Sequence, residues 1–134
     1  MQNLSFGELK TLQELLQPRS FKRGQKIIKA GDAAREMFFL ARGVVSVYLT
    51  DEERHRLATF SPGTAFGEMA FLDGAPRSAN IIADTDVDCD MLTLEDFTSL
   101  DQTQPAIKIK ILEKLCLNLT GKLRKANREL SLFQ

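Results

Sequence analysis

The sequence has little of what metal-dependent catalysis, secretion or membrane insertion requires. Its 134 residues include one histidine and two cysteines, and no apolar run approaches the roughly 18 residues of a membrane span. The first residues lack the basic start and the apolar stretch of a signal peptide. Lys plus Arg number 18 and Asp plus Glu number 18, so the formal charge is zero. That balance argues against a domain that works by general attraction to nucleic acid or anionic lipid. We therefore expect a cytoplasmic chain without membrane insertion.

The single histidine excludes the common catalytic metal centres, because His55 cannot supply the two or three imidazoles of a typical zinc or iron site. It lies in a polar run, 51–56, between two apolar runs, which is typical of an exposed hairpin. The two cysteines, Cys89 and Cys116, do not make a disulfide framework. Cys89 alternates with polar residues, so we expect it to be a small apolar residue of the core.

Three aspartates at alternate positions, Asp84, Asp86 and Asp88, imitate the start of a calcium-binding loop. Such a loop needs glycine at its sixth place for a sharp turn, and Cys89 stands there instead. The alternation favours a strand whose aspartates face water. We expect no metal site.

The residues that are present suit one globular domain, with 43% apolar and 27% charged side chains. Leucines at helical spacing predict a helix over 4–17. Ser5, followed three residues later by Glu8, resembles a capping box, and Pro18 is expected to end this helix.

The region 21–92 has a different pattern, because six glycines separate its short apolar runs. Glycines at intervals of a strand plus a turn predict a sandwich or barrel of short strands. Alternation in one of these runs places Val45, Val47 and Leu49 on one inward face, and alternation in the next run places Leu57 inward.

The last part of the chain has a helical pattern. Thr93 is a predicted N-cap, and Pro105 opens a long helix at a position where its missing N–H costs nothing. Apolar residues at steps of three and four form a stripe from Leu112 to Phe133, which Gly121 interrupts. The stripe can be a lid over a ligand, a dimer seam or a cover for the domain's own core. The basic residues beside it are typical of a solvated helix face, so we expect no direct contact with nucleic acid.

The segment 66–79 contains the side chains and backbone groups best suited to binding a ligand. Gly67 lets a ligand approach the backbone closely, and the next residues can form one helical turn whose free N–H groups suit an anion. Arg77 can bind two oxygens of a phosphate at once, and Glu68 can accept hydrogen bonds from hydroxyls such as those of a ribose. Ser78 has no plausible base partner in the sequence, so we reject a hydrolase.

This segment resembles the phosphate-binding cassette of the cyclic nucleotide-binding domain family in two motifs, Phe66-Gly67-Glu68-Met69-Ala70 and Pro76-Arg77-Ser78-Ala79. The family includes catabolite activator proteins, regulatory subunits of cAMP-dependent protein kinase and cyclic-nucleotide-gated channels. Four further segments look like the family's strands and turns in their usual order. They are 21–25, 30–32, 37–43 and 61–63.

The resemblance implies a mainly β fold with flanking helices. The expected architecture is an eight-stranded β-roll of the double-stranded jelly-roll type, with an N-terminal helix and C-terminal hinge and lid helices. Residues 1–134 would form a single cyclic nucleotide-binding domain, as part of a larger regulated protein.

The resemblance also implies roles for named residues. Glu68 would hold the ribose 2′-hydroxyl, Arg77 would neutralise the cyclic phosphate, and Ser78 would bond the phosphate or an edge of the purine. Backbone N–H groups would complete the phosphate site. They belong to the turn formed by Gly67, Glu68, Met69 and Ala70.

The base would lie between a strand and the last helix. Val47 and Leu57, on adjacent inward faces, would form the apolar wall under it. By position, Lys122 and Leu123 are the nearest match to the residues that cap the base. The competitors on the same helix are Asn118, Thr120 and Arg124.

The implied protein is a regulatory domain and not an enzyme. Its ligand would be a cyclic mononucleotide, with cAMP favoured over cGMP, although the Ser78 hydroxyl can serve either purine because it both donates and accepts. Its partners would be that nucleotide, the remainder of a host protein and, if the stripe is a seam, a second copy of the chain.

Two alternatives stay open. The chain can be the sensor half of a transcription regulator that resembles the catabolite activator proteins, without its DNA-binding domain. It can also be a dimerisation module that binds no nucleotide, in which Glu68 and Arg77 pair with each other.

Overall fold

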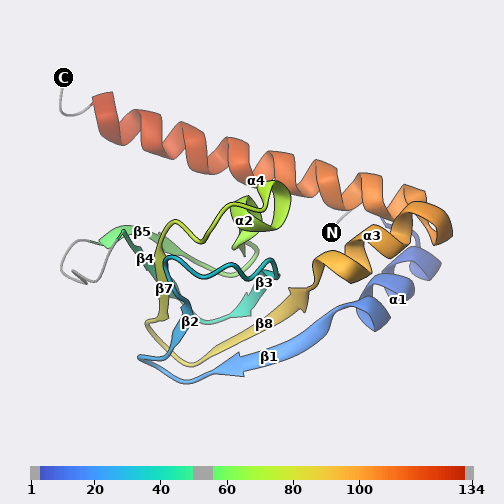
Figure 1. The fold of residues 1–134 in the computed structure, drawn as a ribbon, viewed down its shortest axis with the longest axis horizontal. Helices are drawn as coiled ribbons and strands as arrows, with labels where there is room; N and C mark the ends of the chain where they lie inside the picture. The colour runs from blue at the N-terminus through green and yellow to red at the C-terminus, as the bar shows by residue number, and fades with distance from the viewer. Residues whose placement is uncertain (1–3, 50–55, 132–134) are drawn as a thin grey trace.

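The computed structural model describes residues 4–49 and 56–131 (Figure 1), and this part of the chain contains eight strands in two four-stranded antiparallel sheets. The strands are β1 (Gln17–Phe21), β2 (Lys26–Ile28), β3 (Met37–Arg42), β4 (Val45–Tyr48), β5 (Arg56–Phe60), β6 (Ala65–Phe66), β7 (Asn80–Ala83) and β8 (Val87–Leu92). One sheet has the order β1-β8-β3-β6, and the other has the order β2-β7-β4-β5. The chain therefore crosses repeatedly between two sheets, and the predicted eight-stranded β-roll is confirmed.

Helices flank the sheets at the positions that their capping residues predict. Within the described residues they are α1 (Phe6–Leu15), α2 (Glu68–Asp73), α3 (Leu94–Thr103) and α4 (Pro105–Ser131). The capping box of α1 is confirmed, because the Glu8 N–H donates to Ser5 Oγ at 3.2 Å and the Ser5 N–H donates to Glu8 Oε1 at 3.0 Å. Thr93 Oγ1 accepts a hydrogen bond from the Asp96 N–H at 3.1 Å and caps α3. Pro105 opens α4 as expected.

The sheet region begins earlier than the glycine pattern predicts. α1 ends at Leu15, and Pro18 lies inside β1, paired with Asp90 of β8, rather than at the end of a helix. β1 is the outer strand of its sheet. An outer strand tolerates proline because the N–H groups along its free edge bond no neighbouring strand. The predicted helix end at Pro18 and the predicted start of the sheet region at 21 are therefore both wrong.

Val45 and Val47 of β4 face inward as predicted, whereas the predictions for Leu49 and Leu57 are wrong. Leu49 follows the end of β4 and is exposed, and Leu57 in β5 is 45% exposed. The more buried residues of β5 are Ala58 and Phe60. Ala58 and Phe60 pair in unbroken register with Val47 and Val45 of β4, so alternation in β5 is intact and Leu57 belongs to the opposite, outward face. The polar run that contains His55 lies outside the described residues.

Two apolar clusters form the core. One lies between the sheets and includes Cys89, which is 2% exposed, so the predicted core role of this cysteine is confirmed. The other joins the sheets to the helices and includes Phe71 of α2. The ring of Phe71 packs edge-on against Phe97 of α3, with 5.1 Å between centroids. The buried side of α2 is thereby fixed to the helical layer.

The aspartates that imitate a calcium loop bond to protein donors. Asp84 accepts a hydrogen bond from the Ser46 hydroxyl, and Asp86 Oδ1 accepts one from the Arg23 N–H at 2.9 Å. No group of three or more His, Cys, Asp or Glu residues suited to a metal ion occurs in the part of the chain that the structure describes.

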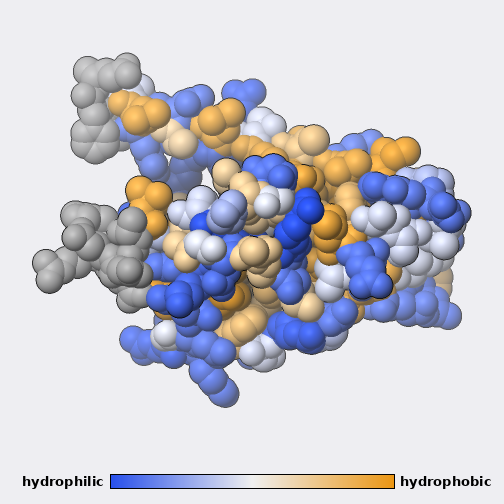
Figure 2. All heavy atoms as spheres, in the orientation of Figure 1, coloured by the Kyte–Doolittle hydropathy of each residue, from blue (hydrophilic) through white to orange (hydrophobic). Residues whose placement is uncertain are grey.

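α4 is 27 residues long and runs across α2 to extend beyond the sheets (Figure 1). Its first half is anchored by Ile107, Ile111 and Leu115, all buried in the helical cluster. Its last part, 123–131, is exposed throughout. Figure 2 shows hydrophobic side chains along this helix on the face toward the viewer. Within 4–49 and 56–131, no helix combines the length and apolar character that crossing a membrane demands.

Candidate functional site

The segment that carries the predicted cassette folds as a tight turn followed by a short helix. Gly67 is the N-cap of α2 and has a φ of 79°, a left-handed conformation that favours glycine. A Cβ at this position would lie 3.0 Å from Arg77 Nη1, 3.0 Å from Ile28 Cδ1 and 3.2 Å from the Glu36 carbonyl oxygen. The absence of a side chain therefore lets the arginine lie directly against the turn.

The guanidinium of Arg77 is held under this turn, and the residue is 6% exposed. Its Nη1 donates to the Gly67 carbonyl at 2.9 Å, and its Nη2 donates to the Glu36 carbonyl at 2.5 Å. The Glu36 carboxylate lies 3.8 Å from Nη2. Burial lowers the pKa of Arg77, and the nearby carboxylates, Glu36 first, oppose that change. Arginine stays charged under these conditions, so the turn contains a fixed positive charge.

Residues of the loop between β2 and β3 fix the cassette through hydrogen bonds. Arg35 Nε donates to the Ala70 carbonyl at 3.2 Å, and Arg35 Nη2 donates to the Phe71 carbonyl at 3.0 Å. A cation at these carbonyls is favourable because the end of a helix carries negative partial charge. The backbone of the same loop exchanges two hydrogen bonds with Arg77, each of 2.8 Å. The sequence analysis missed this support, because nothing in the local pattern connects the loop to the cassette.

Glu68 does not pair with Arg77. Glu68 is 3% exposed. Its Oε1 lies 2.7 Å from Nζ of Lys122, a residue of α4 that follows 54 positions later in the chain. The same ammonium donates to the Ala65 carbonyl at 2.8 Å and lies 4.2 Å from the centroid of the Phe60 ring. Burial lowers the pKa of Lys122, and the charge of Glu68 opposes that change. The two charged cassette residues therefore have separate partners.

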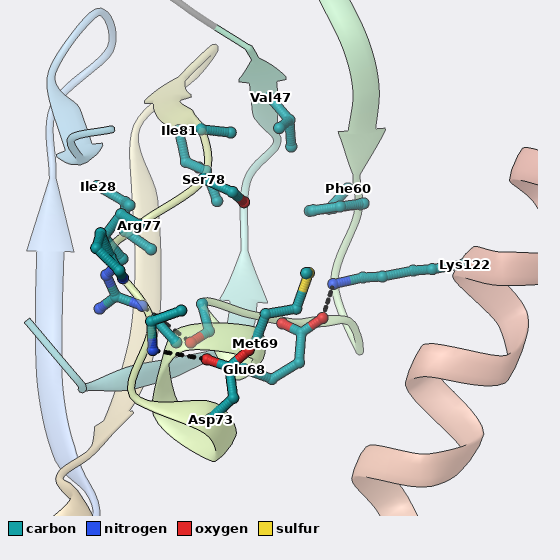
Figure 3. Close-up of a pocket in the computed structure, with 15 residues that line it drawn as sticks. Ile28, Val47, Phe60, Glu68, Met69, Asp73, Arg77, Ser78, Ile81 and Lys122 are labelled. Atoms are coloured by element: carbon teal, nitrogen blue, oxygen red, sulfur yellow. Dashed lines mark hydrogen bonds and ion pairs between the residues drawn. The ribbon is translucent and has the colours of Figure 1, made fainter. Parts of the chain in front are cut away.

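A pocket of about 200 Å³ lies between the sheet of β2, β4, β5 and β7, the cassette and α4. Figure 3 shows Glu68 and Lys122 reaching toward each other on one side of it, with Arg77 on the other. The pocket is lined by Ile28, Val47, Phe60, Gly67, Glu68, Met69, Ala70, Asp73, Ala75, Pro76, Arg77, Ser78, Ala79, Ile81 and Lys122.

Most of the predicted site residues come together at this pocket. Six from the cassette line it, together with one strand residue and one residue of α4. These are Gly67, Glu68, Met69, Ala70, Arg77, Ser78, Val47 and Lys122. Val47 and Lys122, 75 positions apart in the sequence, thus line the same pocket.

Two predicted residues do not reach the pocket. Leu57 lies on the exposed face of β5, and Phe60, on the opposite face of the same strand, lines the pocket instead. Leu123 is 62% exposed, because it is one residue, or about 100° of helix rotation, from Lys122. Phe60 and Ile81 are the aromatic and aliphatic wall residues that the sequence analysis missed. Phe60 was recognisable as the last apolar residue of its strand.

The three competing residues of α4 have other contacts. Asn118 lies on the side of α4 that faces the sheets, and its amide bonds the backbone of Ala65. Thr120 donates to a carbonyl of its own helix, and Arg124 is exposed. Among the five α4 residues weighed from the sequence, Lys122 alone lines the pocket.

The fold and the pocket together define a class of protein. A β-roll presents a small hollow with an apolar wall, a glycine turn, a buried guanidinium and a buried carboxylate, and a long helix closes one side. An anion with hydroxyl groups and an apolar ring fits that set of groups.

Residues 18–104 match the family model described as the cyclic nucleotide-binding domain. This chain belongs to the cyclic nucleotide-binding domain family, and the resemblance carried by the two cassette motifs is confirmed.

Three similar proteins illustrate the match. Glutaminase 2 of Bradyrhizobium diazoefficiens is 38% identical over 130 residues, which is 97% of this chain and 20% of that protein. The cyclic AMP receptor protein of Thermus thermophilus is 32% identical over 119 residues, 87% of this chain and 53% of that protein. The crystal structure of a cyclic nucleotide-binding domain from Methylobacillus flagellatus has a TM-score of 0.90 at 24% identity, and covers 98% of this chain and 75% of that one.

The chain matches only part of the length of these relatives. The chain spans about a fifth of the glutaminase and about half of the receptor protein. The similarity to the glutaminase is thus confined to a small part of that protein, while the similarity to the Methylobacillus domain shows the fold.

Proposed function

We propose that this chain binds a cyclic mononucleotide in the pocket and transmits occupancy through movement of α4. The observation that carries the proposal is a buried carboxylate, Glu68, and a buried guanidinium, Arg77, at one hollow and with separate partners. Had the two groups neutralised each other, the pocket would offer an anion little attraction. Arg77 bonds two neutral carbonyls, and its nearest carboxylate, that of Glu36, is 3.8 Å away and 40% exposed, so positive charge remains at the turn for a phosphate.

Each part of the nucleotide has a place in this proposal. The cyclic phosphate lies at the turn of Gly67 to Ala70, near Arg77 and Ser78. The ribose hydroxyl donates to Glu68. The base lies against an apolar wall. That wall consists of Val47, Phe60 and Ile81.

We favour cAMP over cGMP as the ligand. The hydroxyl of Ser78 can donate and accept, so it serves either purine. The name of the Thermus relative, a cyclic AMP receptor protein, supports the choice of cAMP.

Transmission requires that the nucleotide bind one position of α4 better than another, because equal affinity for both positions would shift neither. α4 borders the pocket through Lys122 and extends past the sheets. An attached or partner domain of a larger, cytoplasmic host protein is the natural receiver of that movement. In this proposal residues 1–134 form one regulatory domain without a catalytic step of their own.

Calorimetric titration with cAMP and with cGMP tests the proposal. We expect saturable binding of both nucleotides with one site per chain and a smaller Kd for cAMP. A cGMP constant about tenfold tighter, a difference of about 1.4 kcal/mol, contradicts the preference. Absence of binding to either nucleotide contradicts the function.

A second role is favoured by the exposed apolar side chains of α4. Ile109, Leu123 and Leu130 are exposed, and they recur at multiples of seven positions. That spacing is typical of the contact seam between two helices. We propose that this face pairs with a second copy of the chain, as in the sensor half of a regulator of the catabolite-activator kind.

Sedimentation of the wild type against Leu123→Glu tests the pairing. We expect a concentration-dependent dimer for the wild type and a monomer for the variant. The control is Lys125→Gln, which makes the same change in net charge, −1, on the same helix away from the apolar face. A wild type that stays monomeric at millimolar concentration contradicts the pairing and leaves the nucleotide site unaffected.

A further inference from the structure

α4 is attached to the domain in two different ways along its length. Up to Leu115 it is held by buried aliphatic side chains. Beyond Leu115, the half-buried residues are Asn118, Leu119 and Lys122, and the other residues through 131 are exposed. The outer part of the helix is therefore held mainly by two polar side chains one turn apart.

Asn118 bonds the backbone of β6. Its Oδ1 accepts from the Ala65 N–H and its Nδ2 donates to the Ala65 carbonyl, both at 3.1 Å. β6 is the outer strand of its sheet, and the backbone groups along an outer edge have no neighbouring strand. The amide thus takes the place of a neighbouring strand, and it shares the Ala65 carbonyl with the Lys122 ammonium.

Lys122 makes a contact of a different kind, because its partners belong to the pocket. The ammonium joins Glu68 to the Ala65 carbonyl and covers one face of the Phe60 ring. Both Glu68 and Phe60 line the hollow. In the proposed function Glu68 binds the ribose and Phe60 contacts part of the base. The Lys122 ammonium lies against both side chains, so it stands where these two parts of the nucleotide would bind.

The size of the pocket agrees with this reading. Its volume is about 200 Å³, whereas sites for small organic ligands commonly measure about 300–1,000 Å³. With Lys122 in this position the hollow is smaller than such sites usually are. Withdrawal of the lysine side chain would enlarge it and free the Glu68 carboxylate.

We propose that Lys122 is an internal competitor of the nucleotide. This inference rests on the proposed function, in which Glu68 accepts the ribose hydroxyl. Binding replaces the ammonium at Glu68 with that hydroxyl and uncovers the Phe60 ring. The outer part of α4 then keeps only the Asn118 contact and the half-buried Leu119, so the helix becomes free to move. Lys122 in this way couples occupancy of the pocket to the position of α4, and it lowers apparent affinity because only the withdrawn state binds.

Three variants of the full chain test the competition. Lys122→Met removes the charge and keeps much of the apolar stem, Lys122→Arg keeps the charge, and Lys125→Met is the matched control on the exposed side of α4. Each is titrated with cAMP by calorimetry, and amide hydrogen exchange over 116–131 is measured with and without cAMP.

We expect Lys122→Met to bind cAMP about tenfold more tightly than the wild type, the scale of one charge-assisted hydrogen bond. Exchange over 116–131 should be faster in free Lys122→Met than in the free wild type, and cAMP should accelerate it only in the wild type. Lys122→Arg should restore both properties toward the wild type, and Lys125→Met should change neither.

Equal or weaker binding by Lys122→Met, while the wild type binds, overturns the competition and leaves the proposed function intact. Failure of both proteins to bind overturns the proposed function and, with it, the competition. Binding by Lys122→Met alone supports the competition at the pocket and contradicts the proposed function of the wild-type chain.

Discussion

At Gly67 the backbone conformation and a close neighbour both exclude a side chain. Other glycines also have a positive φ, as Gly67 does at 79°, but the Cβ position of Gly67 is also 3.0 Å from Arg77 Nη1. Gly63 has a φ of 94° with no atom within 4 Å of the Cβ position. Substitution at Gly63 therefore measures the free-energy cost of a side chain in the left-handed conformation alone. Substitution at Gly67 measures that cost together with the cost of the contact with Arg77.

We expect Gly63→Ala to lower the free energy of unfolding by about 1 kcal/mol and Gly67→Ala by about 2–3 kcal/mol. Urea denaturation of the two variants measures the difference. Only Gly67→Ala should also weaken nucleotide binding. Equal costs would mean that the arginine moves aside easily and does not depend on the glycine.

Arg77 is the residue whose loss should affect binding most. Arg77→Ala removes a charge-assisted, bidentate contact, and we expect the free energy of cAMP binding to become about 3 kcal/mol less favourable, roughly 100-fold in Kd. Because the guanidinium also bonds two carbonyls, a thermal unfolding scan must show that the variant is folded at the titration temperature. Normal binding by a folded Arg77→Ala rules out the assigned role.

The two cysteines differ in burial and should differ in reactivity. Burial raises the pKa of the Cys89 thiol to about 12, and the charges of Asp90 and Asp88 add to this. Cys116 is exposed on α4. Since the thiolate is the reactive form, iodoacetamide should modify Cys116 in the native protein and Cys89 only after unfolding. Mass spectrometry of the intact chain checks this, and rapid modification of native Cys89 would contradict the placement of β8.

At the scale of elements, one ion pair joins the first helix to the last. Lys110 Nζ of α4 lies 2.7 Å from Glu8 Oε1 of α1. The hydrogen bond from Lys110 lowers the pKa of Glu8, and the capping hydrogen bond from the Ser5 backbone adds to this. A carboxyl with a lowered folded-state pKa stabilises the fold above its unfolded-state pKa, about 4.3. That contribution is lost as the pH falls through the folded-state value.

Glu8→Gln keeps a side chain that can complete the capping box but removes the charge. We expect a lower melting temperature than the wild type at pH 7. The difference should shrink below about pH 4 and vanish near pH 2, where the wild-type carboxyl is protonated. A difference that is constant from pH 7 to pH 2 would show that the charge is not the cause.

Elements whose ends have local signals were predictable. Ser5 with Glu8, Thr93 and Pro105 each mark a helix start by chemistry within a few residues, and the structure places helices there. Strand faces were less predictable, because alternation defines two faces of a strand but not which of them is buried. Leu57 lies on the exposed face of β5, one residue from the more buried Ala58.

At the scale of the whole molecule, the topology places site residues from distant parts of the sequence around one pocket. The cassette was recognisable from contiguous motifs, and eight of the ten predicted site residues line one pocket. The partners of its charged groups were not predictable, because Glu36 and Lys122 lie 41 and 54 residues from Arg77 and Glu68. Pairing at such separations depends on how the sheets and α4 pack, which residue spacing does not encode.

The most direct test of the account follows backbone amide signals of the isotopically labelled chain by NMR during titration with cAMP. We predict the largest changes at residues 67–70 and 77–78, with further changes along 116–131 of α4. Changes confined to other surfaces, or none at a millimolar excess of cAMP, would contradict the assignment of this pocket as the nucleotide site.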